Sequence, residues 1–230
     1  MLKRILGVWL LFMLLGCEEE ITQPNPDLSG PGFYPLAIGN FWIYDVERIE
    51  IKALENDTAI FQLREVITAT IVSALGDITY LLNRETRETE NDPWSADSLW
   101  TVRNTGQSLV VTENNVPFVK LVFPVVEGQT WDGNTFNNKG NKSYRFDPVV
   151  SSDLPEEFQG SSDSIRFIKT TISDITSAIV GTDRRFEIYA DGIGLIEKDY
   201  FSISLCTADC DQVGDTLGGL VLSQQLLEFG

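Results

Sequence analysis

The residues of this sequence that could do chemistry are three cysteines and a large set of carboxylates, because the chain contains no histidine. The absence of histidine excludes Ser-His-Asp and Cys-His hydrolysis and most zinc and copper sites. Glycoside hydrolysis by two carboxylates stays open, and Glu85, Glu88 and Glu90 are closely spaced. Arg84 and Arg87 alternate with these glutamates, so we favour solvated charges with cross-strand partners over a catalytic pair. We therefore expect no catalytic residue, no metal and no cofactor.

The cysteine nearest the N-terminus follows a secretory signal. Lys3 and Arg4 form a short basic segment, residues 5–15 are almost entirely apolar, and Cys17 comes after a glycine. This order is typical of a signal peptide, and the apolar run is too short to span a bilayer, which takes ~20 residues. The segment resembles a bacterial lipobox, in which the cysteine thiol receives a diacylglycerol and becomes the new N-terminus. We expect residues 1–16 to be a lipoprotein signal peptide and Cys17 to be lipidated; a cleaved signal with an incidental cysteine, or a short N-terminal anchor, is the alternative.

The other two cysteines, Cys206 and Cys210, lie four positions apart. A metal site would need two further ligands, and outside the cytoplasm a disulfide is the more common fate of such a pair. The chain must turn between them, because the Cα atoms of a disulfide lie roughly 4.4–6.8 Å apart. An alternating segment ends at Leu205 and an Asp- and Gly-rich segment follows. The sequence therefore predicts a disulfide that stiffens a hairpin turn.

Composition and charge limit the partners and the number of domains. The chain has 34 acidic and 17 basic residues, a formal charge of −17, which repels nucleic acid and anionic lipid. Residues 17–32 are rich in breakers and lack apolar periodicity, so we interpret them as the lipidated cysteine and a flexible tether. Residues 33–230 are enough for one sizeable core, and we expect them to form a single β-rich domain.

The rest of the chain has the pattern of β-strands. β-Branched and aromatic residues occur in short runs separated by turn sequences, and no apolar stripe with the helical period exceeds two turns. This pattern predicts an all-β fold with a single antiparallel domain. The expected strands are residues 40–51, 60–72, 79–86, 99–103, 108–112, 118–123, 143–146, 165–175, 185–189, 194–205 and 220–229.

One motif occurs twice. Residues 34–42 and 123–131 both read aromatic, Pro, apolar, two variable positions, Gly, a further pair that begins with an amide, and Trp, with an offset of 89 throughout. Pro restricts φ, Gly permits a positive φ, and the strand that follows starts with a Trp directed to the core. We expect Trp42 and Trp131 to be core residues; a pair of ligand-stacking rings is the alternative.

These two segments, together with residues 189–196, which read Tyr-Ala-Asp-Gly-Ile-Gly-Leu-Ile, resemble a group of outer-membrane lipoproteins of Bacteroidota. The group is defined by its pattern rather than by an activity, so the resemblance implies no catalytic residues. It implies an outer-membrane location. It also implies a strongly curved sheet or half-open barrel like those of lipoprotein carriers and receptors, with a β-sandwich as the alternative.

The resemblance implies two further features. Acidic residues directly after a lipidated cysteine are typical of surface export in such bacteria, and residues 18–20 are all Glu, so we favour the cell surface over the periplasmic face. Exported proteins there also carry O-glycans on Ser or Thr between Asp and an apolar residue, a pattern that equally marks a turn passing into a strand. The matching positions are Thr58, Ser98, Ser164 and Thr216.

Together these observations favour a non-catalytic function. We expect a lipid-anchored envelope protein that contacts the membrane through its N-terminal acyl chains and whose β domain binds or scaffolds another envelope component. The alternative is a carrier or sensor of a hydrophobic ligand in the cavity of an open β-barrel. A carboxylate-only glycan hydrolase ranks last. A filled interior would favour the first hypothesis, and a large dry cavity would favour the second.

Overall fold

The computed structural model describes residues 30–52, 55–161, 165–177, 179–208 and 212–230. Three predicted modification sites, Cys17, Ser164 and Cys210, lie outside the described residues. The described helical segments are single 3-10 turns, η2 (Pro31–Phe33), η3 (Ser151–Asp153) and η4 (Glu156–Phe158). The strands are β1 (Phe41–Lys52), β2 (Asp57–Val72), β3 (Ile78–Arg87), β4 (Ser95–Asn104), β5 (Ser108–Glu113), β6 (Val116–Val122), β7 (Thr130–Asp132), β8 (Ser143–Asp147), β9 (Phe167–Ser177), β10 (Gly181–Ala190), β11 (Gly194–Leu205) and β12 (Thr216–Phe229).

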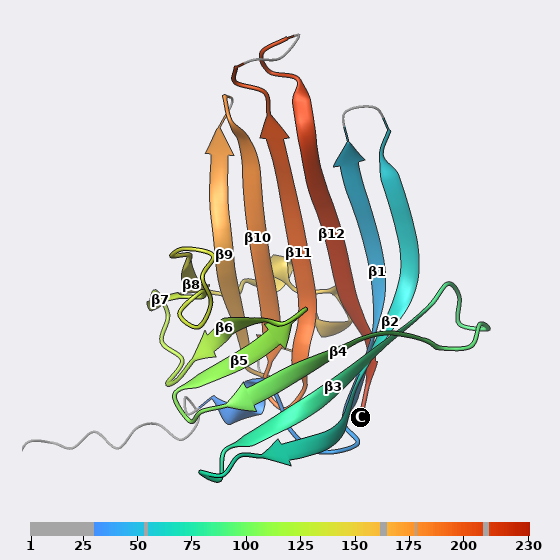
Figure 1. The fold of residues 1–230 in the computed structure, drawn as a ribbon, viewed down its shortest axis with the longest axis vertical. Helices are drawn as coiled ribbons and strands as arrows, with labels where there is room; N and C mark the ends of the chain where they lie inside the picture. Colours follow the sequence, from blue (N-terminus) through green and yellow to red (C-terminus); the bar gives the residue numbers. More distant parts are fainter. Residues whose placement is uncertain (1–29, 53–54, 162–164, 178, 209–211) are drawn as a thin grey trace, which may run out of the picture.

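The strands form one 12-stranded antiparallel sheet in the order β6-β5-β4-β3-β2-β1-β12-β11-β10-β9-β8-β7. The sheet is two six-stranded meanders, β1–β6 and β7–β12, joined by the pairing of β1 with β12. It curls until β6 and β7 face each other, which makes a nearly closed barrel with one unsealed seam (Figure 1). The predicted all-β fold and half-open barrel are confirmed, and the β-sandwich alternative is wrong because there is a single continuous sheet.

Part of the sheet extends beyond the barrel. β2 pairs with β3 only from Gln62 onward, so its first residues pair with β1 alone. The upper parts of β9–β12, β1 and β2 therefore rise past the level at which β3–β6 cross in front of them (Figure 1). We call this extension the protruding sheet. The barrel core lies below it, beneath the crossing strands.

Each half begins with the repeated motif, and the glycine of the motif makes the same backbone contact in both copies, although the peptide bond before the proline is cis only in Phe123-Pro124. Gly39 donates its N–H to Ile67 O at 2.8 Å, and Gly128 donates its N–H to Phe146 O at 2.8 Å. Both glycines have positive φ, +100° at Gly39 and +77° at Gly128. The predicted turn is thus confirmed: the glycine reverses the chain, and the next strand in each half pairs with it.

The core fills the barrel with inward-facing side chains at alternate strand positions. Its largest fully buried members are Trp42, Tyr44 and Tyr189. Trp42 donates its indole N–H to Ile193 O at 2.5 Å. A Cβ on Gly194 would lie 2.9 Å from that indole nitrogen, so the glycine of the 189–196 motif makes room for the tryptophan of the first motif.

The opposite side of the sheet is covered over part of its area. Residues 148–161, which contain η3 and η4, cross behind β9–β11 (Figure 1). Leu154 and Phe158 are buried there, and Phe158 packs edge-on against Phe167 with ring centroids 6.0 Å apart. Ile188 is fully buried, as is its neighbour Glu187, which points into the barrel.

Candidate functional site

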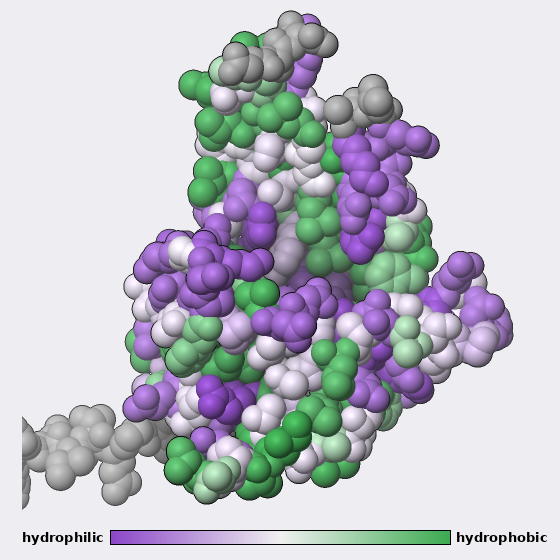
Figure 2. All heavy atoms as spheres, in the orientation of Figure 1, coloured by the Kyte–Doolittle hydropathy of each residue, from purple (hydrophilic) through white to green (hydrophobic). Residues whose placement is uncertain are grey.

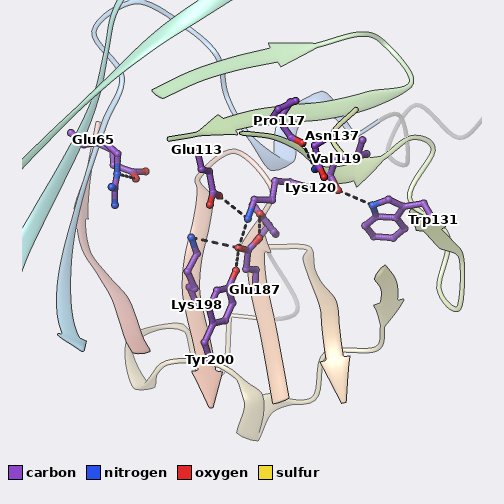
Figure 3. A network of polar contacts seen from close by, with 12 residues as sticks. Glu65, Glu113, Pro117, Val119, Lys120, Trp131, Asn137, Glu187, Lys198 and Tyr200 are labelled. Atoms are coloured by element: carbon purple, nitrogen blue, oxygen red, sulfur yellow. Dashed lines mark hydrogen bonds and ion pairs between the residues drawn. The ribbon is translucent and has the colours of Figure 1, made fainter. Parts of the chain in front are cut away.

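A network of buried charges lies inside the barrel (Figure 3). Lys120 Nζ is 2.8 Å from Glu187 Oε1 and 2.8 Å from Glu113 Oε1. Lys198 Nζ is 3.5 Å from the same Glu187 oxygen. The side chain of Glu187 is 1% exposed and that of Lys120 is 5% exposed. Two lysines and two glutamates thus form a group whose formal charges cancel. We call these four residues the ion network.

Strand geometry explains how these side chains meet. Glu187 and Lys198 are direct cross-strand partners on β10 and β11, so both point to the same face. Lys120 is the unpaired residue of a β-bulge, because Leu109 pairs with Leu121 and Val110 pairs with Val119. A bulge turns a side chain that regular alternation would direct elsewhere. The bulge therefore lets both Lys120 and Leu121 be buried.

Two tyrosines complete the coordination of Glu187. Tyr189 donates its hydroxyl to Glu187 Oε2 at 2.6 Å, and Tyr200 donates to Oε1 at 2.6 Å. Burial and the carboxylate of Glu187 raise the pKa of both tyrosines well above the ordinary value of 10.0. The hydroxyls therefore keep their protons and act as donors, so the buried carboxylate has a partner on each oxygen.

The electrostatics keep the central pair ionised. Burial alone raises the pKa of Glu187, but Lys120, Lys198 and the hydrogen bond from Tyr189 outweigh it and hold that pKa well below its usual range. Burial lowers the pKa of Lys120, whereas Glu113 and Glu187 raise it more strongly, so the net change is upward. Neither residue can exchange a proton near neutral pH. The ion network is thus suited to holding the fold and unsuited to acid–base catalysis, which needs a pKa near the working pH.

A second charged pair lies on neighbouring strands. Arg84 Nε donates to Glu65 Oε1 at 2.9 Å, and both side chains are largely buried. The guanidinium of Arg84 also stacks on Trp100, 3.8 Å from the ring centroid, and its Nη1 is 3.2 Å from Asp97 Oδ2. The aromatic ring and the two carboxylates together compensate the charge of the planar Arg84 guanidinium.

The space left inside the barrel is small. A cavity of about 20 Å³ lies between the ion network, Glu65 and Trp100, which is room for about one water molecule. The indole N–H of Trp100 is buried without a hydrogen-bond partner in the described residues. Glu113 and Glu187 converge on one lysine with no room for a sugar ring. Among the described residues, the two carboxylates of the ion network thus have no substrate-sized cleft between them.

Larger hollows are open to the surface. One of about 530 Å³ lies between β1, β2 and the outer ends of β3 and β4; Ala59 and Phe61 contribute its apolar lining, and Arg48, Arg87 and Asp92 contribute charges. Figure 2 shows hydrophilic residues gathered over the upper end of β1 and β2, which borders this hollow. Mixed charge around a small apolar floor suits a polar macromolecular contact better than a buried lipid.

Trp42 is a core residue, as predicted, whereas Trp131 is half-buried and packs against the core. Trp42 is 2% exposed, so no ligand can stack on it. Trp131 lies at the seam: it donates its indole N–H to Val119 O at 2.9 Å and packs on Phe146, with centroids 4.4 Å apart. A joint ligand-stacking site of the two rings is excluded by the burial of Trp42.

The other predicted sites are scattered. Thr58 and Thr216 are exposed at the starts of β2 and β12. Ser98 is partly buried, and its hydroxyl donates to Asp97 Oδ2 at 2.7 Å. Cys206 is 2% exposed; its predicted disulfide partner lies outside the described residues, so the bridge stays a prediction. Glu85 forms an ion pair with Arg64, which fits the interpretation of cross-strand charges.

Sequence reasoning missed the ion network. A charged residue within an apolar run was the available signal, since Lys120 lies between Val119 and Leu121, and Glu187 lies between Phe186 and Ile188. From the alternating pattern alone, each of these two residues would be predicted to be a solvated charge on a strand. The contact that joins them spans 67 positions in the chain, which no local pattern reveals.

The sequence matches no known protein-family model, and no curated protein matches it. Among the described residues, no helix has the length and hydropathy needed to cross a bilayer. In the same part of the chain, no three acidic or cysteine side chains are grouped so that they could hold a metal ion. The site must therefore be interpreted from its own geometry.

Proposed function

We propose that this protein is a lipid-anchored protein of the bacterial outer membrane whose β domain is a non-catalytic binding or scaffold module. The packing around the ion network carries this proposal, because the cavity there, of about 20 Å³, holds neither a lipid nor a sugar. The buried charges support it, since each of them has an ion-pair partner. The protruding sheet and the hollow beside Arg48 and Phe61 remain as the surfaces on which an envelope component can bind.

A carrier of a hydrophobic ligand is the second candidate, and one observation favours it. A groove of about 300 Å³ beneath residues 148–161 is lined mainly by apolar side chains, among them Phe33, Leu154, Phe167 and Ile168. This groove lies where residues 149–154 meet the residues at the start of β9. A carrier would therefore hold its ligand there and not beside the ion network.

The two candidates differ in what co-purifies with the protein. The full chain is produced in a bacterial host that processes lipoproteins, extracted, and analysed by native mass spectrometry. We expect acyl chains on Cys17 and no stoichiometric non-covalent lipid. One bound hydrophobic molecule per chain would contradict the scaffold and support the carrier. Cys17→Ala should abolish fatty-acid labelling and release the protein from the membrane fraction; continued labelling would contradict the lipid anchor.

A further inference from the structure

The turn between β2 and β3 exposes a group of large apolar side chains, and the β9–β10 turn at the opposite end exposes another, at Ile175, Ile179 and Val180. Ile71, Val72, Leu75 and Ile78 are 56%, 63%, 92% and 44% exposed. From residue 66 to residue 83 the sequence contains a single charged residue, Asp77. We call residues 71–78 the apolar tip. Exposed apolar patches of this kind mark contact surfaces in soluble domains.

The apolar tip is firmly built and apolar on both faces. Ser73 N donates to Asp77 O at 2.9 Å, and Ser73 Oγ accepts the N–H groups of Leu75 and Asp77. Val72 pairs with Ile78 and so shares its face, whereas Ile71 points to the other face. A protein partner on one side would leave half of these side chains in water. An apolar medium that surrounds the hairpin end would cover all of them.

The apolar tip lies at the end of the molecule where the described chain begins. A hollow of about 470 Å³ is lined by Tyr34 and Leu36 from the start of the chain and by Gly76, Asp77 and Ile78 from the tip. Figure 1 shows the first described residues, in blue, and the β2–β3 turn together at the lower end, away from the β9–β10 and β11–β12 turns. Twelve residues lie between Cys17 and the first described residue, Gly30, and this stretch can span at most ~45 Å.

We propose that the apolar tip inserts into the bilayer that holds the acyl chains of Cys17, so that the domain sits in a fixed orientation with its protruding sheet directed away from the membrane. This inference rests on the proposed lipid anchor. The anchor keeps the tip close to the bilayer, and this high effective concentration lets a few apolar side chains suffice. The four positions from Ile71 to Leu75 span at most ~13 Å at the rise of a strand, close to the ~5–10 Å depth that interfacial segments reach.

The chemistry of the apolar tip selects the lipid interior and not the headgroup charge. It contains no Lys or Arg, so attraction to anionic lipid contributes nothing. The single charge, Asp77, lies at the turn with its oxygen 3.4 Å from Ser73 Oγ. Insertion should therefore be the same in neutral and anionic vesicles and should not weaken as salt is raised.

The experiment uses the lipidated full chain in vesicles of phosphatidylcholine and phosphatidylethanolamine. An environment-sensitive fluorescent amino acid replaces Leu75 in one protein. In the matched control it replaces Val213, which is 67% exposed and lies between β11 and β12 at the opposite end. We expect the probe at position 75 to shift its emission to the blue and to lose fluorescence when the lipids carry brominated acyl chains. The probe at position 213 should do neither.

Each outcome decides the matter. Vesicle-bound, acylated protein whose probe at position 75 stays in water would overturn the insertion and leave the lipid anchor standing. Equal quenching at positions 75 and 213 would also overturn it, because the domain would then have no fixed orientation. Loss of quenching at high salt would overturn the apolar mode of contact. A protein whose Cys17 carries no acyl chain by mass spectrometry would overturn both proposals, and this is seen before any vesicle is made.

Discussion

The two halves of the sheet meet twice, and the two junctions are built differently. β1 and β12 form a ladder from Trp42 opposite Phe229 to Lys52 opposite Gly218, interrupted by one register shift between Ile43 and Tyr44. Three hydrogen bonds cross from β6 to the β7 side in the described residues, and two of them come from side chains. One junction is thus closed by backbone pairing and the other by particular residues. Substitution of a side chain that crosses the seam should therefore open the seam locally, whereas backbone pairing keeps the ladder closed.

The ion network reinforces the weaker junction. Lys120 and Glu113 belong to the first half, on β6 and β5, whereas Glu187 and Lys198 belong to the second half, on β10 and β11. The contacts therefore run through the interior from one half to the other, next to the seam (Figure 3). Buried ion pairs often add little net stability, but removal of one partner leaves an uncompensated buried charge.

The largest effect should come from Lys120→Met, which keeps the side-chain volume and removes the charge between two carboxylates. We expect a loss of about 3–5 kcal/mol in the free energy of unfolding, because Glu187 then lacks its nearest cation. The matched variant is Lys198→Met, whose Nζ lies 3.5 Å from Glu187 and leaves Lys120 in place. Urea denaturation measures both. Equal losses in the two variants would mean that the ion network does not depend on its contact across the halves.

The next effect tests the two tryptophans of the repeated motif. Trp42→Phe and Trp131→Phe each remove an indole N–H that donates to a backbone carbonyl, Ile193 O or Val119 O. We expect losses of about 2–3 kcal/mol at Trp42, which is fully buried, and about 1–2 kcal/mol at the half-buried Trp131.

Hydrogen exchange distinguishes the two junctions in these variants. Trp131→Phe should speed exchange of the Val119 amide, which donates to Gly133 O across the seam, while amides of the β1–β12 ladder stay protected. Trp42→Phe should not show this local effect. Uniform acceleration over the whole sheet in Trp131→Phe would contradict a locally closed seam.

The strands and turns could be predicted from the sequence because the patterns that indicate them, alternation and turn residues, are local. Alternation placed β11 at residues 194–205, the bounds that the structure has. The motif predicted positive φ at Gly39 and Gly128. β7 was not predicted as a separate run, since it has only three residues, Thr130–Asp132, too few for a period to be counted.

The ion network could not be read in the same way. Its members are charged residues at inward positions, and a single sequence does not show which bulge turns Lys120 inward. The register shift beside Leu109 depends on how β5 and β6 pair. The partner, Glu187, is 67 positions away. Pairing between strands that are distant in the chain therefore determines which charges meet in the ion network, whereas local periodicity determines where the strands lie.

We expect a smaller loss of stability, equal in size, when the glycine of either motif is replaced. Gly39→Val and Gly128→Val each force a β-branched residue to a positive φ, and we expect each to cost about 1–3 kcal/mol. No atom lies within 4 Å of an added Cβ at either glycine, so the cost is backbone strain and not a clash. Gly39→Asn and Gly128→Asn should recover much of the loss, because Asn tolerates this conformation. Thermal denaturation would contradict the equivalence if one glycine tolerated Val.

The smallest effect concerns one half only and leaves both junctions intact. Glu197 lies on β11, on the side covered by η3 and η4. Burial raises its pKa to about 7, and Asp199, Asp153 and Glu157 add to the increase while Lys169 opposes it. The folded protein thus holds a proton that the unfolded chain has released above its ordinary pKa of 4.5. Stability contributed by this residue therefore falls as pH rises from 4.5 to about 7.

Glu197→Gln removes this dependence because the amide is neutral at every pH. We expect the variant to match the wild type at pH 4 and to exceed it by about 1 kcal/mol at pH 8, after allowance for partial solvent screening. The difference should grow between pH 4.5 and pH 7 and stay constant above that. Glu127→Gln, at an exposed turn of the same half, is the control and should show no such growth. Urea denaturation across this pH range would contradict the prediction if Glu197→Gln were less stable than the wild type at pH 8, because the carboxylate would then have a stabilising partner in the folded state.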